Sequence, residues 1–155
     1  MRPGRRLAVD VGKVRVGLAI SDFHGILASP LKNIARQAES ADTVSLILEA
    51  IKDESILEIY VGLPVSMSGK ASASTDDAIA LATAIEAAST TPVRMLDERL
   101  TTVTATAALR ISGKNSKDGR QIIDQIAATV ILEQALAIEK SSQRLPGLAL
   151  KDLDV

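Results

Sequence analysis

Two short apolar runs open the chain, and a single glycine separates them. Residues 5–11 and 15–21 alternate or run apolar, rich in Val, Leu and Ile, and Gly12 lies between them. This pattern is typical of a β-hairpin, because two apolar strands are joined by a residue that tolerates a tight turn. A third short strand is predicted over residues 27–33. The chain therefore begins with three predicted strands.

After these strands, helical spacing and β-rich runs alternate. Apolar residues recur at helical spacing after Ser40 or Asp42, either of which can cap the predicted helix. A β-rich run over residues 56–62 is then stopped by Pro64, and a loop rich in Ser and Gly follows over residues 65–75. The remaining predicted elements are a helix over 76–88, a strand over 92–97, a short helix over 101–111, a strongly helical segment over 119–139 and a poorly ordered tail over 140–155.

The order of these elements predicts the fold class. An antiparallel hairpin followed by helix–strand units indicates an α/β protein, with a mixed five-stranded sheet flanked by helices. No internal repeat or long linker divides the chain, so we expect one domain over residues 1–139 followed by the tail. Sites in such sheets lie where loops leave the ends of the strands.

Composition narrows the class of protein. The 155 residues are 46% hydrophobic and include no Cys, and Phe23 and Tyr60 are the only aromatic residues. So few aromatic side chains argue against a platform on which nucleobases stack, and the lack of Cys excludes disulfides and thiolate metal sites. No apolar run reaches the length that spans a membrane, and Asp10 interrupts the run near the N-terminus. We therefore expect a cytoplasmic protein without membrane contact.

Four carboxylates are candidates for a metal site. Asp10 ends an apolar run beside Gly12, where a rigid strand can hold a metal ion, although an Asp at this place can also serve only the turn. Asp97 and Glu98 end a predicted strand, and strand alternation lets one of the pair face Asp10. Asp124 lies among apolar residues of a predicted helix, so we expect it either to pair with an Arg or to bind metal.

Positive charge is concentrated in two segments, although the formal net charge is −1. Arg2, Arg5 and Arg6 lie together at the start of the chain, and the segment 110–120 carries four cations against one Asp. The net charge argues against non-specific coating of nucleic acid, but it leaves room for a local basic surface. The segment 110–120 is either a solvated loop or, because it precedes the helix that carries Asp124, a phosphate-binding flank of the carboxylates.

Four motifs, taken together and in order, point to one family. They are Asp10-Val11-Gly12 with Arg15-Val16-Gly17-Leu18-Ala19, Val61-Gly62-Leu63-Pro64, Asp97-Glu98-Arg99-Leu100-Thr101-Thr102, and Asp124-Gln125-Ile126-Ala127-Ala128. The chain resembles the YqgF/RuvX family over about residues 5–138. That family has the RNase H-like fold of Holliday-junction resolvases and is regarded as the pre-16S rRNA nuclease of bacteria.

The resemblance implies an RNase H-like fold with an acidic metal site. Its catalytic residues would be Asp10, Glu98 and Asp124, and Asp97 is a further candidate ligand. The implied reaction is hydrolysis of phosphodiester bonds with Mg²⁺ or Mn²⁺, two ions acting together to activate a water and stabilise the leaving oxygen. Oxygen ligands suit these ions better than Zn²⁺.

The chain departs from the related patterns at two places. Classical resolvases of this fold carry a carboxylate on the strand that corresponds to residues 56–62, whereas this chain has Val61 and Gly62 there. The pair Asp97-Glu98 on the next strand must then substitute for it. Val14 occupies a position that is commonly basic in the family.

Several functions fit these observations. The leading hypothesis is a nuclease that processes the 5′ end of pre-16S rRNA in ribosome biogenesis. Its alternatives are a Holliday junction resolvase acting on DNA and a non-catalytic nucleic-acid-binding protein on the same fold. An actin-like ATPase would need two related domains, for which the chain is too short. The partner is precursor rRNA or branched DNA, bound by a monomer or homodimer. The residues expected to contact nucleic acid are Lys13, Arg15, Lys70, Arg99, Lys114, Lys117 and Arg120.

Overall fold

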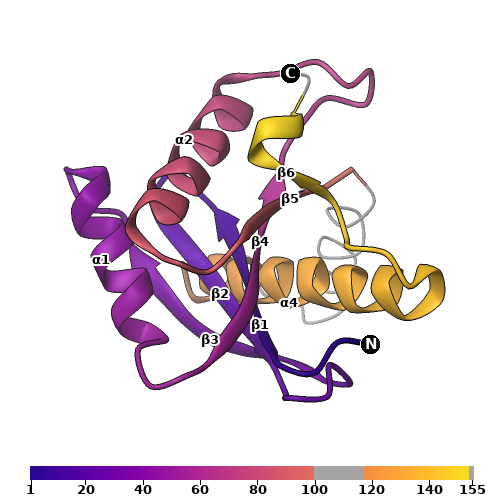
Figure 1. Ribbon diagram of the computed structural model, residues 1–155. Coiled ribbons are helices and arrows are strands. Elements are labelled where there is room, and N and C mark those ends of the chain that lie inside the picture. Colours follow the sequence, from indigo (N-terminus) through magenta and orange to yellow (C-terminus); the bar gives the residue numbers. More distant parts are fainter. Residues whose placement is uncertain (100–116, 154–155) are drawn as a thin grey trace.

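The computed structural model describes residues 1–99 and 117–153, with side chains described over 1–99 and 126–153. Within this part, one sheet carries helices on both faces (Figure 1). Its strands are β1 (Arg5–Val11), β2 (Arg15–Ser21), β3 (Ala28–Ala35), β4 (Ile56–Leu63), β5 (Val93–Asp97) and β6 (Leu148–Ala149). The helical elements are α1 (Ser40–Ala50), α2 (Ala73–Ala88), α4 (Lys117–Ser142) and the 3-10 helix η1 (Leu150–Asp152).

The sheet is mixed, as predicted, with the strand order β3-β2-β1-β4-β5-β6. β1 pairs antiparallel with β2 and parallel with β4, and β4 pairs parallel with β5. The three parallel strands therefore end at the same edge of the sheet. The five predicted strands are all present, but the described chain contains six, because β6 was not predicted.

Two helices begin at residues other than those expected. The residue that precedes α1 is Glu39, whose side chain makes no capping hydrogen bond, so neither Ser40 nor Asp42 is the cap. α2 starts at Ala73, three residues earlier than predicted. Ser72 and Thr75 form a capping box there, in which each side chain accepts a hydrogen bond from the other residue's backbone N–H. This cap ends the loop that follows β4.

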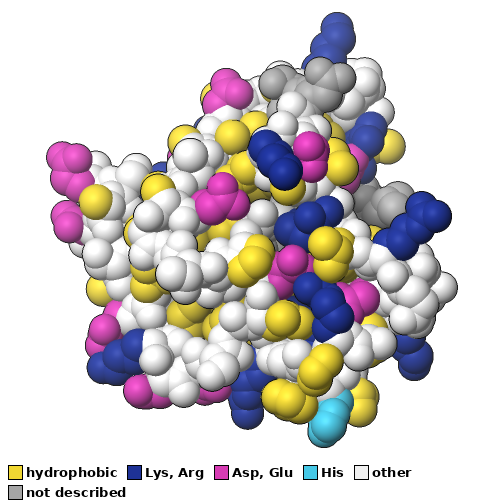
Figure 2. Space-filling model, viewed as in Figure 1, with side chains coloured by type: hydrophobic (Ala, Val, Ile, Leu, Met, Phe, Trp, Pro, Cys, Tyr) yellow, Lys and Arg dark blue, Asp and Glu magenta, His cyan; other side chains and the backbone are white. Residues whose placement is uncertain are grey.

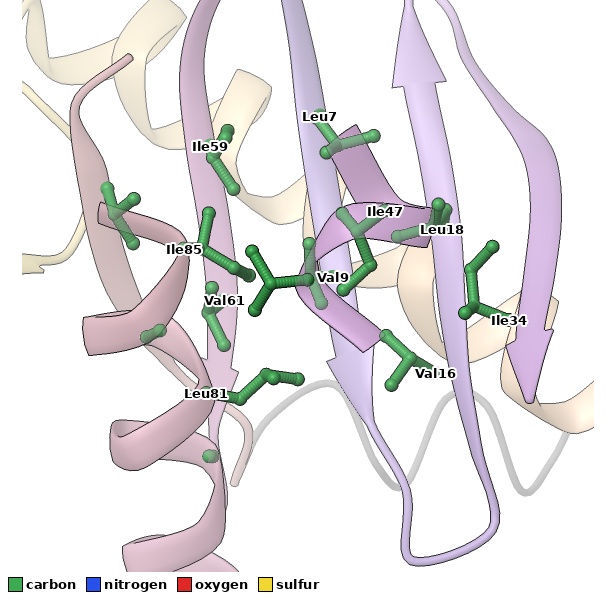
Figure 3. Packing of buried hydrophobic residues seen from close by; sticks show 14 of the residues in the cluster. Leu7, Val9, Val16, Leu18, Ile34, Ile47, Ile59, Val61, Leu81 and Ile85 are labelled. Carbon is green, nitrogen blue, oxygen red and sulfur yellow. The ribbon is translucent and has the colours of Figure 1, made fainter. Parts of the chain in front are cut away.

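The larger part of the core lies between the sheet and the pair α1 and α2 (Figure 3). Alternate residues of the central strands point to this face, because the side-chain period of a strand is two. They pack against Ile47 of α1 and against Leu81 and Ile85 of α2. The strand residues on this face are Leu7, Val9, Val16, Leu18, Ile34, Ile59 and Val61.

The opposite face of the sheet is covered by α4. Small side chains line both sides of this contact, with Ala8 and Ala19 on the strands and Ala128 and Ala135 on the helix, all fully buried. These alanines pack beside larger buried side chains of the same layer, which are Tyr60 and Leu96 on the strands and Ile131, Leu132 and Leu136 on the helix. The even-numbered residues Ala8 of β1, Tyr60 of β4 and Leu96 of β5 therefore face α4.

The C-terminal segment is ordered by contacts with β5, which corrects the expectation of a poorly ordered tail. α4 continues to Ser142, and β6 then pairs antiparallel with β5. Arg94 on β5 donates hydrogen bonds to the carbonyls of Pro146 (2.6 Å) and Gly147 (2.7 Å). Gly147 has φ +66, and a Cβ there would lie 2.1 Å from the Met95 carbonyl oxygen, so the close approach requires glycine.

The N-terminal arginines are engaged in structure rather than spread over a basic surface. Arg6 is fully buried and donates to Glu139 of α4 at 2.9 Å. Arg2 donates to Glu139 at 2.6 Å and to Glu58 of β4 at 2.8 Å, and Tyr60 donates to Glu58 at 2.7 Å. This network of two arginines, two glutamates and one tyrosine ties the start of the chain to the end of α4.

Some predictions fall outside the described residues. The helix predicted over 101–111 and the cations Arg110 and Lys114 of the basic segment belong to this group. Within the described part of the chain, no helix is both long and apolar enough to cross a membrane.

Candidate metal centre

Strand alternation brings three positions together on the face that α4 covers. Asp10 lies two residues after Ala8 on β1, and Gly62 lies two residues after Tyr60 on β4, so both face the side of the sheet that α4 covers. Val9 is paired with Val61, so the next residues of these parallel strands, Asp10 and Gly62, are neighbours. Glu98 follows β5 and has the parity of Leu96, which faces the same side.

The Glu98 side chain lies directly over Gly62. A Cβ built on Gly62 would lie 2.2 Å from Glu98 Oε1 and 2.7 Å from Glu98 Cδ, so any larger residue would displace the carboxyl group. The Glu98 backbone N–H donates to the Leu63 carbonyl at 3.1 Å, which fixes the chain just after β5. The carboxyl of Glu98 thus occupies the space that a side chain on β4 would fill.

Asp10 and Glu98 are in direct contact. Burial is the largest cause that raises the pKa of Glu98, and the charge of Asp10, a hydrogen bond with Asp10 and the charge of Asp97 raise it further, to about 9 in all. Two carboxyl groups in contact disfavour each other's ionisation when no cation compensates their charge. A pair held together in this way is a ready pair of oxygen ligands for a cation.

Asp97 faces away from this pair. Its carboxylate forms a forked ion pair with Arg99, whose Nε lies 2.8 Å from Asp97 Oδ2, and it also accepts the Arg99 backbone N–H at 2.9 Å. The hydrogen bond from the Arg99 side chain lowers the pKa of Asp97. One member of the Asp97-Glu98 pair faces Asp10, as alternation predicts, and it is Glu98.

Asp124 belongs to α4, the helix that covers the face on which Asp10 and Glu98 lie. Its side chain is outside the described side chains, and so are those of Lys117 and Arg120, while Lys114 is outside the described residues altogether. Among the side chains that are described, no group of three His, Asp or Glu residues gathers at one point. Asp124 as a third ligand therefore stays a prediction.

The turn after Asp10 is tight and carries two of the predicted cations. The Gly12 N–H donates to the Arg15 carbonyl at 2.9 Å, and a Cβ on Gly12 would lie 2.5 Å from that oxygen. Lys13 is exposed and Arg15 is half-buried. Arg36, which the sequence analysis missed, donates from Nη1 to the Gly12 carbonyl at 2.9 Å. No sequence motif marks this arginine, because it lies 24 residues from the turn that it contacts.

The loop between β4 and α2 lies next to Arg99. Its residues 66–70 form a turn in which the Gly69 N–H donates to the Ser66 carbonyl at 2.7 Å and the Lys70 N–H donates to Ser66 Oγ at 3.0 Å. Arg99 Nη1 donates to the Met67 carbonyl at 3.4 Å. Lys70 is exposed. The loop and Arg99 therefore form one polar surface beside Asp97, at the edge of the sheet where Glu98 lies.

Comparison with known proteins gives a family. The family model RuvX, described as Holliday junction resolvase, matches residues 4–138. A protein of Leifsonia xyli subsp. xyli, named "putative pre-16S rRNA nuclease", is 50% identical over 147 residues, which cover 95% of this chain and 94% of that protein. A protein of Streptomyces avermitilis with the same name is 42% identical over 149 residues, covering 95% of this chain and 94% of that protein.

The fold has a counterpart among solved structures. The Thermus thermophilus RuvC structure in complex with a Holliday junction substrate superposes with a TM-score of 0.57 at 13% identity, over 92% of this chain and 99% of that one. This likeness confirms the RNase H-like fold expected from the motifs. Because the family match spans most of the sequence and the relatives cover nearly all of it, the chain belongs to the RuvX family.

Proposed function

We propose that this protein is a divalent-metal-dependent nuclease that hydrolyses phosphodiester bonds. The observation that carries the proposal is the contact between the carboxyl groups of Asp10 and Glu98 beside Gly62, because paired carboxyl groups can bind a divalent cation together. The membership of a family described as Holliday junction resolvase supports the same reaction class. Asp124, on the helix that covers this face, is the third ligand that we propose.

The residues of this centre fit Mg²⁺ or Mn²⁺. The donors would be carboxyl oxygens, which these ions prefer, and a bound cation would favour the ionised form of both Asp10 and Glu98. A pair of such ions, when bound, activates a water and stabilises the leaving oxygen of an in-line displacement. Asp97 is held by Arg99, so we assign the ligand role on this strand end to Glu98.

The protein's own residues supply orientation. Asp10 is fixed by the pairing of β1 with strands on both sides, and Glu98 is fixed by its backbone bond to Leu63. Lys13, Arg15, Lys70 and Arg99 lie on or beside the segments that border this edge, so we propose that they contact phosphates. Contacts of this kind position the backbone of a nucleic acid without reading its sequence.

We propose the 5′ end of pre-16S rRNA as the substrate, and therefore a cytoplasmic protein that acts in ribosome biogenesis. The name of the relatives at 42–50% identity supports this choice. A branched DNA junction is the second candidate, which the family description and the RuvC-like fold favour. A non-catalytic nucleic-acid-binding protein on the same fold would bind either substrate without cutting it.

The deciding experiment compares cleavage of precursor 16S rRNA with cleavage of a four-way DNA junction, in Mg²⁺, in Mn²⁺ and in chelator. Asp10→Asn should abolish cleavage of the preferred substrate while the protein stays folded, since it removes one ligand and relieves repulsion with Glu98. Asp53→Asn, an exposed carboxylate outside this edge, is the matched control and should cleave normally. Cleavage by Asp10→Asn at the wild-type rate would contradict the proposed centre.

A further inference from the structure

Arg36 lies directly after β3 and binds the turn between β1 and β2 at two points. Its backbone N–H donates to the Val14 carbonyl at 2.8 Å. Its side-chain Nη1 donates to the Gly12 carbonyl at 2.9 Å. These two bonds span the turn, and Gly12 is only two residues from Asp10. Arg36 therefore holds the backbone of the turn that begins two residues beyond Asp10.

Asp77 on α2 fixes that side chain. Arg36 Nη1 lies 2.8 Å from Asp77 Oδ2 and Nη2 lies 3.0 Å from Asp77 Oδ1, so the two groups form a forked pair. The same Nη1 donates to Gly12 and to Asp77, which ties the carbonyl and the carboxylate to one planar group. The Arg36 side chain is 18% exposed and the Asp77 side chain is 37% exposed, so water screens this pair mainly from the Asp77 side.

α2 is in turn tied to the strand end that holds Glu98. Thr75, one turn of helix from its cap, donates from Oγ1 to the Pro64 carbonyl. Leu63, the residue before Pro64, accepts a hydrogen bond from the Glu98 backbone N–H. A continuous path of hydrogen bonds and helix backbone thus runs from the turn after Asp10 through Arg36, Asp77 and α2 to the backbone of Glu98.

We propose that Arg36 and Asp77 are positioning residues of the metal centre, which set the Asp10 carboxylate in register with Glu98 through the Gly12 carbonyl. This inference rests on the proposed metal-dependent function. Residues that orient metal ligands commonly change metal affinity or activity by about 10- to 100-fold when they are replaced. Arg36→Ala should therefore weaken Mn²⁺ binding by at least about 10-fold. Asp77→Asn should weaken it less, because it leaves the bond to Gly12 in place.

Arg36→Lys separates positioning from mere charge. A lysine keeps the positive charge but presents one ammonium group, which cannot reproduce the planar fork that joins Gly12 and Asp77. We expect its Mn²⁺ affinity to lie between those of wild type and Arg36→Ala. Arg5→Ala is the matched control, since Arg5 pairs with Glu54 at 3.5 Å at the start of β1, the end away from Asp10. Its affinity should equal that of wild type.

The test is a titration of Mn²⁺ into each variant, followed by the electron paramagnetic resonance signal of free Mn²⁺ at a temperature where circular dichroism shows the variants folded. Asp10→Asn defines the specific site. Sucrose, which strengthens folding, should raise the thermal midpoint of Arg36→Ala without restoring its affinity if the role is positional. A full return of affinity in sucrose would mean that the pair only stabilises the fold.

The outcomes separate the two proposals. Equal Mn²⁺ affinity of wild type and Arg36→Ala overturns the positioning role alone, and if Arg36→Ala does not fold, equal affinity of wild type and Asp77→Asn does the same. If wild type and Asp10→Asn bind Mn²⁺ equally, the metal centre itself is wrong, and the positioning role falls with it. Weaker binding by Arg36→Ala and Asp77→Asn, with Arg5→Ala unchanged, supports the inference.

Discussion

At the scale of single residues, the candidate centre depends on the absence of a side chain at Gly62. The strand β4 brings no carboxylate to the site, and the space above Gly62 is filled instead by the carboxyl of Glu98 from beyond β5. Glycine is required here for room, because a Cβ would overlap the Glu98 side chain. The carboxyl group of Glu98 thus fills the space that a side chain on the neighbouring strand would take.

Gly62→Ala should therefore disable the centre without touching a ligand. The new methyl group would lie 2.2 Å from Glu98 Oε1, so the Glu98 side chain must shift from the position in which it contacts Asp10. We expect at least about a 10-fold loss of Mn²⁺ affinity, as for other residues that orient ligands, and a cost of about 1–3 kcal/mol in the free energy of unfolding from overpacking. Calorimetric Mn²⁺ titration and urea unfolding measure the two effects.

A double-mutant cycle with Glu98→Gln isolates the mechanism. If Gly62→Ala acts through Glu98, the double variant should bind Mn²⁺ no more weakly than Glu98→Gln alone, because the displaced ligand is already lost. Affinity losses that simply add would show that Gly62→Ala damages the centre by another route.

Sequence reasoning identified the carboxyl groups of the candidate centre but not Gly62, Arg36 and Asp77 around them. Period-two alternation predicted that one of Asp97 and Glu98 faces Asp10, since this depends only on local strand geometry. The role of Gly62 depends on a residue 36 positions later in the chain. The pairing of Arg36 with Asp77 joins residues 41 positions apart, a contact that no local pattern encodes.

At the scale of elements, the predicted helices and strands differ from the structure at β6, which depends on tertiary contacts, and at the start of α2, which depends on a local cap. β6 is two residues long and follows Pro146 and Gly147, so its sequence reads as a tail. Its pairing depends on Arg94, which lies some 50 residues earlier on β5. The early start of α2 is a local effect, because the box of Ser72 and Thr75 is a recognisable cap.

Ser72→Ala should destabilise the protein through this cap. The Ser72 side chain accepts the Thr75 N–H, and without it that N–H at the start of α2 loses its partner. We expect a loss of about 1 kcal/mol in the free energy of unfolding, seen as a lower urea midpoint with an unchanged slope. Ser45→Ala within α1 is the control and should leave the midpoint unchanged or raise it, because alanine favours helix. Equal midpoints of wild type and Ser72→Ala would contradict the assignment.

At the scale of the whole molecule, the first residues of the chain contact the last turns of α4. On the surface, hydrophobic side chains lie beside the single histidine (Figure 2). Phe23, Ile26 and Leu27, in the turn between β2 and β3, are more than half exposed. The network of Arg2, Arg6 and Glu139 lies at the N-terminal end of β1, opposite to the Asp10 end. Charge within the fold is thus divided between a structural cluster at one edge and a candidate metal centre at the other.

Glu139 should make stability depend on acid pH. Burial by itself would raise its pKa, but hydrogen bonds from Arg2 and the charges of Arg6 and Arg2 outweigh burial and lower the pKa from 4.5 to about 2. A carboxyl whose pKa is lower in the folded state stabilises the protein above its unfolded pKa, and this contribution is lost as pH falls from about 5 towards 2. A shift of this size corresponds to about 3 kcal/mol, which is plausible for a side chain only 6% exposed.

Glu139→Gln tests this contribution directly. Urea unfolding at pH 7 should show the variant less stable than wild type by about 3 kcal/mol, and the difference should shrink as pH approaches 2, where Glu139 is itself protonated. Glu133→Gln, an exposed position on the same helix, should differ little from wild type at any pH. A gap between wild type and Glu139→Gln that stays constant from pH 7 to pH 2 would mean that packing, rather than the charge shared with Arg2 and Arg6, holds the two ends of the chain together.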